Sequence, residues 1–407
     1  MITPSPKCRP NPDRAVYVQG VIDQQLIDRL TPEIIKLKSK SFDPITVFID
    51  SPGGSVTLME TLLRLLTASD QDLADPTRLI TVVTSMAGSA AADLLSSGDF
   101  ALAYPGASVL YHGSRVSQEG PLTTELTSLL TQYLREANQT YATRLARKIV
   151  DRFMFRFVSS QAEFDDVRKR DPTQTSDLDC FLTLISENLS APAKRVLEGA
   201  KARYSRYDDL LNWVVKRSKV DSVKTKAQFE AIQIKAIVDF EVRNNKKNKD
   251  WSFEGGGLNS LTYDFFLLNE YLGNYHSGYF RSLCLRYGHF LLSDDEIAEL
   301  ENAPEGEESQ SKVNKAQPLL LPVWSFFVSL CHALQQGEND LSARDAVWLG
   351  LIDEVIGVDE LPSRRLAYEY EPDDAPAEVI TEERADAATE TERFEGGKND
   401  TKRPKTI

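Results

Sequence analysis

Residues 84–112 read T-S-M-A-G-S-A-A-A-D-L-L-S-S-G-D-F-A-L-A-Y-P-G-A-S-V-L-Y-H, and this stretch decides the fold. It follows an apolar run, Leu79 to Val83, which predicts a buried strand. The small residues after this run predict a tight turn into a helix that Leu94 and Leu95 bury and Gly98 ends. A serine at such a junction lies beside unpaired helix N–H groups, which can stabilise a developing oxyanion.

Two short apolar segments follow the predicted helix and end at a histidine. Residues 100–104 and 109–111 are each typical of a strand, and a Pro-Gly turn at residues 105–106 separates them. His112 comes directly after the second segment, where it can return toward Ser89. Ser89 and His112 are therefore the candidate nucleophile and general base.

This segment resembles the nucleophile-to-base segment of the Clp-type proteolytic subunit, a serine peptidase that forms ring-shaped chambers. The residues that carry the resemblance are Ser89, Gly98, Pro105 and His112. Residues 50–56, D-S-P-G-G-S-V, are similar to the S-P-G-G-S-V turn of that family. Residues 341–353 are similar to its S-A-x-x-A-v-x-x-G-L-I-D ending. The three segments also resemble the wider crotonase-like superfamily, which includes signal-peptide-peptidase-type enzymes.

The alternation of predicted strands and helices along residues 15–67 indicates parallel βαβ units with right-handed crossovers. The resemblance implies an α/β, ClpP/crotonase-like core of repeated βαβ units in a spiral, with a long handle helix. The stripe of apolar residues between Leu122 and Ile149 predicts this helix. It suits packing against a partner, and packing within the chain explains it equally well.

The chain departs from the family after the handle helix, because 226 residues separate His112 from the candidate acid, Glu338. We therefore expect an inserted, mostly helical domain. The expected organisation is a flexible arm at 1–13, a peptidase domain at 14–151 and 322–358, the insertion at 152–321, and a disordered acidic tail at 359–407.

The resemblance assigns the oxyanion donors to backbone N–H groups. Glycines after a strand allow positive φ and close approach to a ligand, and the N–H of Gly53 or Gly54 is expected to donate there. The N–H of Ala90, directly after the nucleophile, is the second expected donor. Ala90 and Ala91 stand where the family has Met-Gly.

Three positions have alternatives. Ser85 competes with Ser89, but Ser89 lies nine residues before Gly98, as the resemblance requires. Asp340 is the alternative to Glu338 as the acid that orients His112. Asp93 lies on the same helix face as Ser89; it either pairs with a base from the insertion or faces the pocket and favours basic substrates.

Composition limits the remaining functions. A formal net charge of −14 argues against nucleic-acid binding as the main role. The four cysteines are scattered, which predicts reduced thiols in a cytoplasmic protein rather than a metal site. No apolar run has the ~18 residues that span a bilayer, and the polar start has no signal-peptide pattern.

The predicted function is a serine endopeptidase that forms an acyl-enzyme on Ser89 and needs no cofactor or metal. Its expected partners are a peptide or unfolded protein and further copies of itself in a ring. The short segment before the first strand argues against docking to an AAA+ unfoldase. The alternatives are a non-catalytic, partner-binding scaffold and a Ser–Lys enzyme in which a lysine from the insertion replaces His112.

Overall fold

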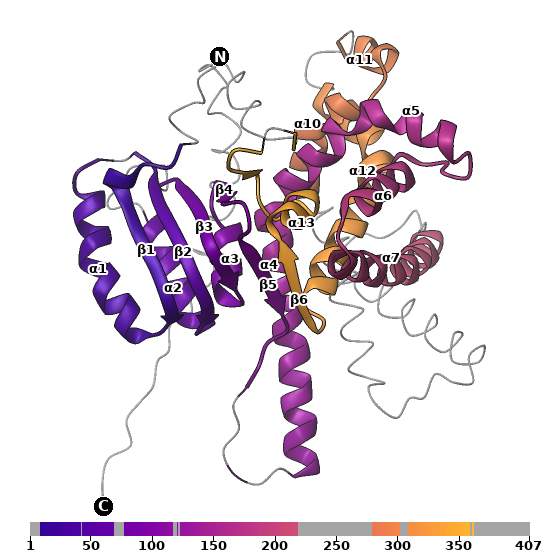
Figure 1. Ribbon diagram of the computed structural model, residues 1–407. Helices are drawn as coiled ribbons and strands as arrows, with labels where there is room; N and C mark the ends of the chain where they lie inside the picture. Colours follow the sequence, from indigo (N-terminus) through magenta and orange to yellow (C-terminus); the bar gives the residue numbers. More distant parts are fainter. Residues whose placement is uncertain are drawn as a thin grey trace, which may run out of the picture. The chain divides into compact units, whose positions relative to one another are not determined.

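A computed structural model describes residues 9–41, 43–68, 77–116, 120, 123–218, 279–301, 308–358 and 360–361. Its sheet is mainly parallel, and helices connect the strands (Figure 1). This arrangement confirms the α/β class that the sequence predicts and is consistent with the ClpP/crotonase-like fold.

Three long parallel strands form the first half of the sheet in the order in which they occur along the chain. They are β1 (Ala15–Ile22), β2 (Ile45–Gly54) and β3 (Leu79–Gly88), and the helices between them are α1 (Gln24–Lys38) and α2 (Val56–Thr67). A 3-10 turn, η2 (Pro12–Arg14), precedes β1. Val16, Ile45 and Val82 are fully buried, which explains why the apolar runs form strands covered by helices.

Strand β3 changes partner halfway along its length. Its first half pairs with β4 (Phe100–Ala103), and its last residues, Met86–Gly88, pair with β5 (Ser108–His112); both pairings are parallel. The short helix α3 (Ala90–Ser96) leaves β3 between these strands. Gly98 follows α3 because a Cβ there would lie 2.3 Å from the Thr81 hydroxyl oxygen.

The C-terminal part of the described chain returns to this sheet. Strand β6 (Glu338–Ser342) pairs antiparallel with β5, and β7 (Glu354–Val355) pairs parallel with β4. The helix α13 (Ala343–Trp348) connects them and begins with a capping box between Ser342 and Asp345.

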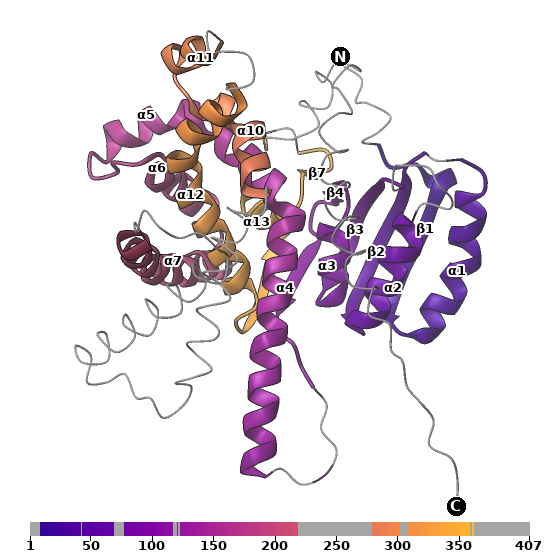
Figure 2. The same ribbon diagram turned by 180° about the vertical axis from the view of Figure 1, so that it is seen from behind.

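Most of the described residues between β5 and β6 are helical. The helices are α4 (Thr124–Ser159), α5 (Gln161–Arg170), α6 (Asp177–Asn188), α7 (Ala191–Ser218), α10 (Tyr279–Leu291), α11 (Asp294–Glu301) and α12 (Glu308–Leu334). Residues 219–278 of the predicted insertion lie outside the described residues. Helix α4 continues past residue 152, where the insertion is predicted to begin. Beyond that point Phe153 packs on Phe181 and Phe327, with ring centroids 5.5 and 4.5 Å apart, and α4 runs beside α12 (Figure 2).

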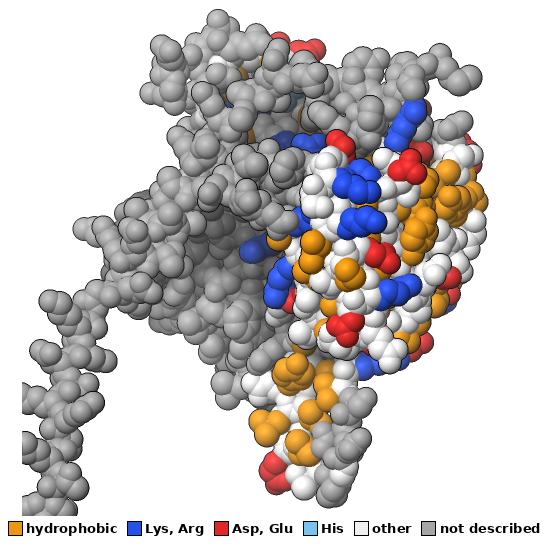
Figure 3. Space-filling view, turned by 90° about the vertical axis from the view of Figure 1, so that its left-hand side faces the viewer, with side chains coloured by type: hydrophobic (Ala, Val, Ile, Leu, Met, Phe, Trp, Pro, Cys, Tyr) orange, Lys and Arg blue, Asp and Glu red, His pale blue; other side chains and the backbone are white. Residues whose placement is uncertain are grey.

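The N-terminal half of α4 carries exposed apolar side chains. Leu129 and Tyr133 are 64% and 60% exposed. Hydrophobic side chains gather at the lower end of the view in Figure 3, where Figure 1 places this half of α4. No helix of the described part of the chain is both long and apolar enough to cross a membrane.

The predicted arm and tail are described only at their edges. Residues 1–8 and 362–407 lie outside the described residues. At the first edge, the N–H of Asn11 donates to Thr46 Oγ1 at 2.8 Å. At the second, Glu360 pairs with Arg344 at 3.6 Å.

Candidate active site

Ser89 occupies the sharp junction between β3 and α3. Its φ is 53° and its ψ is −124°, and it is the one non-glycine residue of the described chain with φ in the left-handed range. Such a conformation costs about 1–3 kcal/mol, and strained residues of this kind gather at active sites. Ser89 holds the N-cap position, yet its hydroxyl makes no capping hydrogen bond. The Ser89 hydroxyl therefore lies at the start of α3 but takes no part in capping the helix.

The end of β2 approaches Ser89 so closely that only glycine fits. A Cβ on Gly53 would lie 2.4 Å from Gly88 O and 2.7 Å from Ser89 Cβ, and Gly53 has a φ of 98°. The N–H of Ala90 opens α3 beside this contact, and first-turn N–H groups have no carbonyl of their own helix to bind. The structure therefore brings Gly53 and Ala90 together at Ser89.

The two glycines differ in what their N–H groups do. The N–H of Gly53 donates to Ser51 Oγ at 3.1 Å. The N–H of Ser55 donates to Ile22 O, on β1, at 2.9 Å. This contact with β1 is therefore made by the residue after Gly54 and not by Gly54 itself. Gly54 is also exposed, so it is the better placed of the two to donate to a ligand.

His112 ends β5, the parallel neighbour of the strand that leads to Ser89. Gly88 pairs with Leu110, and the N–H of Ser89 donates to Leu110 O at 2.8 Å. The imidazole Nδ1 lies 2.6 Å from Gly113 O. A carbonyl can only accept, so Nδ1 carries the proton and Nε2 is left as the acceptor that a general base needs. Ser89 and His112 are not hydrogen bonded to each other in this structure, a separation that is common before substrate binds.

Both candidate acids lie on β6, which pairs antiparallel with β5, the strand that ends at His112. Glu338 is directly opposite His112, and Asp340 is opposite Leu110. The Glu338 carboxylate pairs with Arg115, and these side chains are 67% and 61% exposed. Register thus brings Glu338 beside His112 across 226 residues of sequence, while its carboxylate binds the arginine rather than the imidazole.

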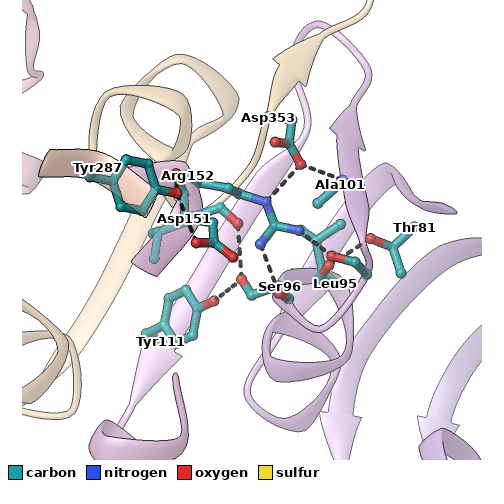
Figure 4. Close-up of polar contacts among 11 residues, drawn as sticks. Thr81, Leu95, Ser96, Ala101, Tyr111, Asp151, Arg152, Tyr287 and Asp353 are labelled. Carbon is teal, nitrogen blue, oxygen red and sulfur yellow. Dashed lines mark hydrogen bonds and ion pairs between the residues drawn. The ribbon is translucent and has the colours of Figure 1, made fainter. Parts of the chain in front are cut away.

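A buried polar network fixes the strand of His112 against the helix of Ser89 (Figure 4). The Tyr111 hydroxyl lies 2.6 Å from Ser96 Oγ and donates to Ala92 O at 3.2 Å. Arg152 of α4 donates to Ser96 O at 2.8 Å and pairs with Asp353 at 2.7 Å. Burial raises the pKa of the Tyr111 phenol, so the hydroxyl keeps its proton. Tyr111 directly precedes His112, and this network therefore limits how β5 and α3 can shift.

Asp93 lies among groups from α2 and α4. Burial raises the pKa of its carboxyl to about 6, while Lys148 and Arg144 act in the opposite direction and Glu60 adds to the rise. Among the described residues, the basic groups that act on it thus come from the handle helix, within residues 14–151, rather than from the predicted insertion.

Several of these residues escape sequence reasoning. Gly113 acts through its backbone carbonyl, which no side-chain pattern marks. Arg115 lies three residues after His112, and Lys148 is one of many basic residues on a long helix. The signal that could have found Lys148 and Arg144 is their spacing of four on α4.

Comparison with known families identifies one match. Residues 9–148 match the model of the family described as Clp protease. The matched range includes Gly53, Gly54, Ser89, Ala90 and His112 and ends before β6, which carries Glu338. No curated protein matches the chain.

Proposed function

Because residues 9–148 match the model of the Clp protease family, we propose that this chain is a serine endopeptidase with Ser89 as nucleophile and His112 as general base. The observation that carries the proposal is the strained backbone of Ser89, whose hydroxyl caps nothing. Gly53 in contact with Ser89, and the parallel pairing that ends at His112, support it.

In the proposed reaction, Ser89 Oγ bonds to the peptide carbonyl carbon while its proton passes to His112 Nε2. The N–H groups of Gly54 and Ala90 donate to the oxyanion that forms. The C–N bond then breaks as His112 returns the proton to the leaving amine. Water attacks the acyl-enzyme with His112 again accepting the proton, and the bond to Ser89 Oγ breaks as His112 returns this proton to the serine and the acid product leaves.

The proposed acid is Glu338, supported by its place opposite His112. The Gly113 carbonyl holds the ring so that Nδ1 keeps its proton, and the Glu338 carboxylate adds a negative charge nearby. Asp340 remains the alternative.

Clp proteases are oligomers that bind peptide substrates. We propose that this chain assembles with further copies through the exposed apolar half of α4, represented by Leu129 and Tyr133. Its proposed substrate is a peptide or an unfolded protein, in the cytoplasm.

The test is labelling with a fluorophosphonate, followed by mapping of the adduct by mass spectrometry. We expect an adduct on Ser89 that disappears in Ser89→Ala and falls at least ~100-fold in His112→Ala. Ser85→Ala, which removes an exposed serine on β3, the strand that leads to Ser89, is the matched control and should label normally. An adduct on Ser85, or none in the folded wild type, rejects the proposal.

Two observations favour a second candidate, a non-catalytic scaffold that binds a partner. The Glu338 carboxylate is paired with Arg115, and Ser89 is not hydrogen bonded to His112. A scaffold predicts no labelling at Ser89. A Ser–Lys enzyme, in contrast, predicts that His112→Ala labels as fast as the wild type.

A further inference from the structure

Helix α3 leaves one stripe uncovered, and that stripe begins at the candidate nucleophile. Ser89, Asp93 and Ser97 are each half-buried, whereas the other residues from Ala90 to Ser96 are buried. A spacing of four places the three side chains on one helix face. Asp93 follows Ser89 by about 6 Å along the helix axis. A group held at Ser89 therefore has Asp93 as its neighbour on the open face.

The facing helix supplies cations, but each of them is engaged elsewhere. Lys148 Nζ donates to Ser97 Oγ at 2.8 Å. Arg144 pairs with Glu60 of α2, and its guanidinium lies 5.9 Å from the Tyr141 ring centroid. Arg144 and Glu60 thus compensate each other, whereas Lys148 is bound to a neutral hydroxyl.

The Asp93 carboxylate has no hydrogen bond or ion pair with any residue that the structure describes. A half-buried acid in this condition lacks the partner that would offset its lost hydration. Burial raises the pKa of Asp93 to about 6 even though Lys148 and Arg144 act against the rise. The group is therefore mostly ionised at pH 7–8, and a cation brought by a ligand would complete the site.

We propose that Asp93 is the specificity-determining residue of a subsite for a basic side chain, lysine or arginine, on the residue whose carbonyl Ser89 attacks. This inference rests on the proposed function. A lysine or arginine stem spans the distance of about one helical turn from Ser89, and its charged end then meets the unpaired carboxylate. An apolar side chain in the same place would cover the carboxylate without pairing it, which is unfavourable.

The test uses peptidyl phosphonates that differ only in the side chain at the attacked position: arginine, lysine, leucine or glutamate. Each labelling rate at Ser89 is divided by the rate of a plain fluorophosphonate, which carries no such side chain. We expect the wild type to prefer arginine over leucine by at least ~10-fold. Asp93→Asn should lower that preference about 10- to 100-fold, and Asp93→Leu should reverse it. Asp28→Asn makes the same chemical change on the exposed face of α1 and should leave every ratio unchanged.

The outcomes separate the two proposals. Normal labelling by the plain probe with an arginine preference that survives Asp93→Asn overturns the subsite and leaves the peptidase intact. A wild type that reacts faster with the leucine or glutamate phosphonate also overturns the subsite and leaves the peptidase proposal intact. No labelling by the plain probe overturns both proposals. For a peptide substrate, the loss in Asp93→Asn should appear mainly as a raised KM for arginine peptides, which a merely structural defect would not confine to one side chain.

Discussion

Helix α4 places two basic residues, Lys148 and Arg152, near the end of α3, one helical turn apart. Lys148 is exposed, whereas Arg152 is buried and ion-paired. Arg152 is 3% exposed and pairs with Asp353, which is fully buried. It also donates to the Ser96 carbonyl, while the second Oδ2 contact of Asp353 comes from the N–H of Ala101 at 2.7 Å. Lys148 binds only the Ser97 hydroxyl among described groups and leaves Asp93 unpaired.

The difference shows how one helix pair serves two purposes. At Arg152 every charge is matched, so the contact holds α3, β4 and β7 in fixed positions. At Lys148 the acid is left unmatched on the open stripe beside Ser89. Removing one member of the buried pair would leave an unpaired buried charge, so the pair resists disruption, whereas the Asp93 carboxylate is available to a cation of a ligand.

The largest effect should come from Arg152→Met. The change leaves Asp353 buried without its cation, which costs about 3–5 kcal/mol of unfolding free energy. Lys148→Met on the same helix should cost less than ~1 kcal/mol, because its contact is exposed. Urea denaturation of the two variants measures both values. Similar losses for the two would show that the surroundings of these residues do not differ energetically.

Tyr111→Phe should have the next largest effect. It removes the hydroxyl that joins Ser96 to Ala92 O, at a cost of about 2 kcal/mol. Because Tyr111 precedes His112, fluorophosphonate labelling at Ser89 should also slow under conditions where the variant is fully folded. Tyr104→Phe alters a tyrosine that is 42% exposed and should change neither quantity. A loss of stability with unchanged labelling at Ser89 would contradict the positioning role.

Asp93→Asn should change how stability depends on pH. The pKa of Asp93 is raised from 3.8 to about 6 by burial. Between these values the folded chain binds the proton more strongly than the unfolded chain, so the wild type loses stability as pH rises from about 4 to about 6. The side chain is half-buried, so we expect asparagine to recover about 1 kcal/mol at pH 7 and nothing at pH 3.5.

Urea denaturation between pH 3.5 and 8 measures this difference. Lys148→Met serves as the opposite control, because it removes a cation that lowers the pKa of Asp93 and should move the loss to higher pH. A wild type whose stability rises through this window more than that of Asp93→Asn would show that the carboxylate is paired.

Sequence reasoning succeeds where the determining interactions are local. The turn at Ser89, the burial of Leu94 and Leu95 and the strand that ends at His112 follow from small residues and apolar runs a few positions apart. Counting back from Ser342 also selects Glu338, the residue that the register places opposite His112.

The surroundings of the acids could not be predicted in this way. Whether Glu338 turns to His112 or to Arg115 depends on side-chain conformations, which periodicity does not constrain. The environment of Asp93 depends on the rotation of α4, whose residues lie about 50 positions further along the chain. A helical stripe gives the spacing of Arg144 and Lys148 but not the element that they face.

The smallest effect should come from Glu338→Gln. This variant tests an exposed ion pair, for comparison with the buried pair of Arg152 and Asp353. Glu338 and Arg115 are 67% and 61% exposed, so the loss of unfolding free energy should stay below ~0.5 kcal/mol. Labelling at Ser89 should fall only about five-fold, because the Gly113 carbonyl still orients His112 and only a screened charge is lost. Asp340→Asn, two residues along the same strand, is the matched control. A loss of ~1,000-fold or more in Glu338→Gln would show that the carboxylate leaves Arg115 and takes the place of the Gly113 carbonyl on Nδ1 during the reaction.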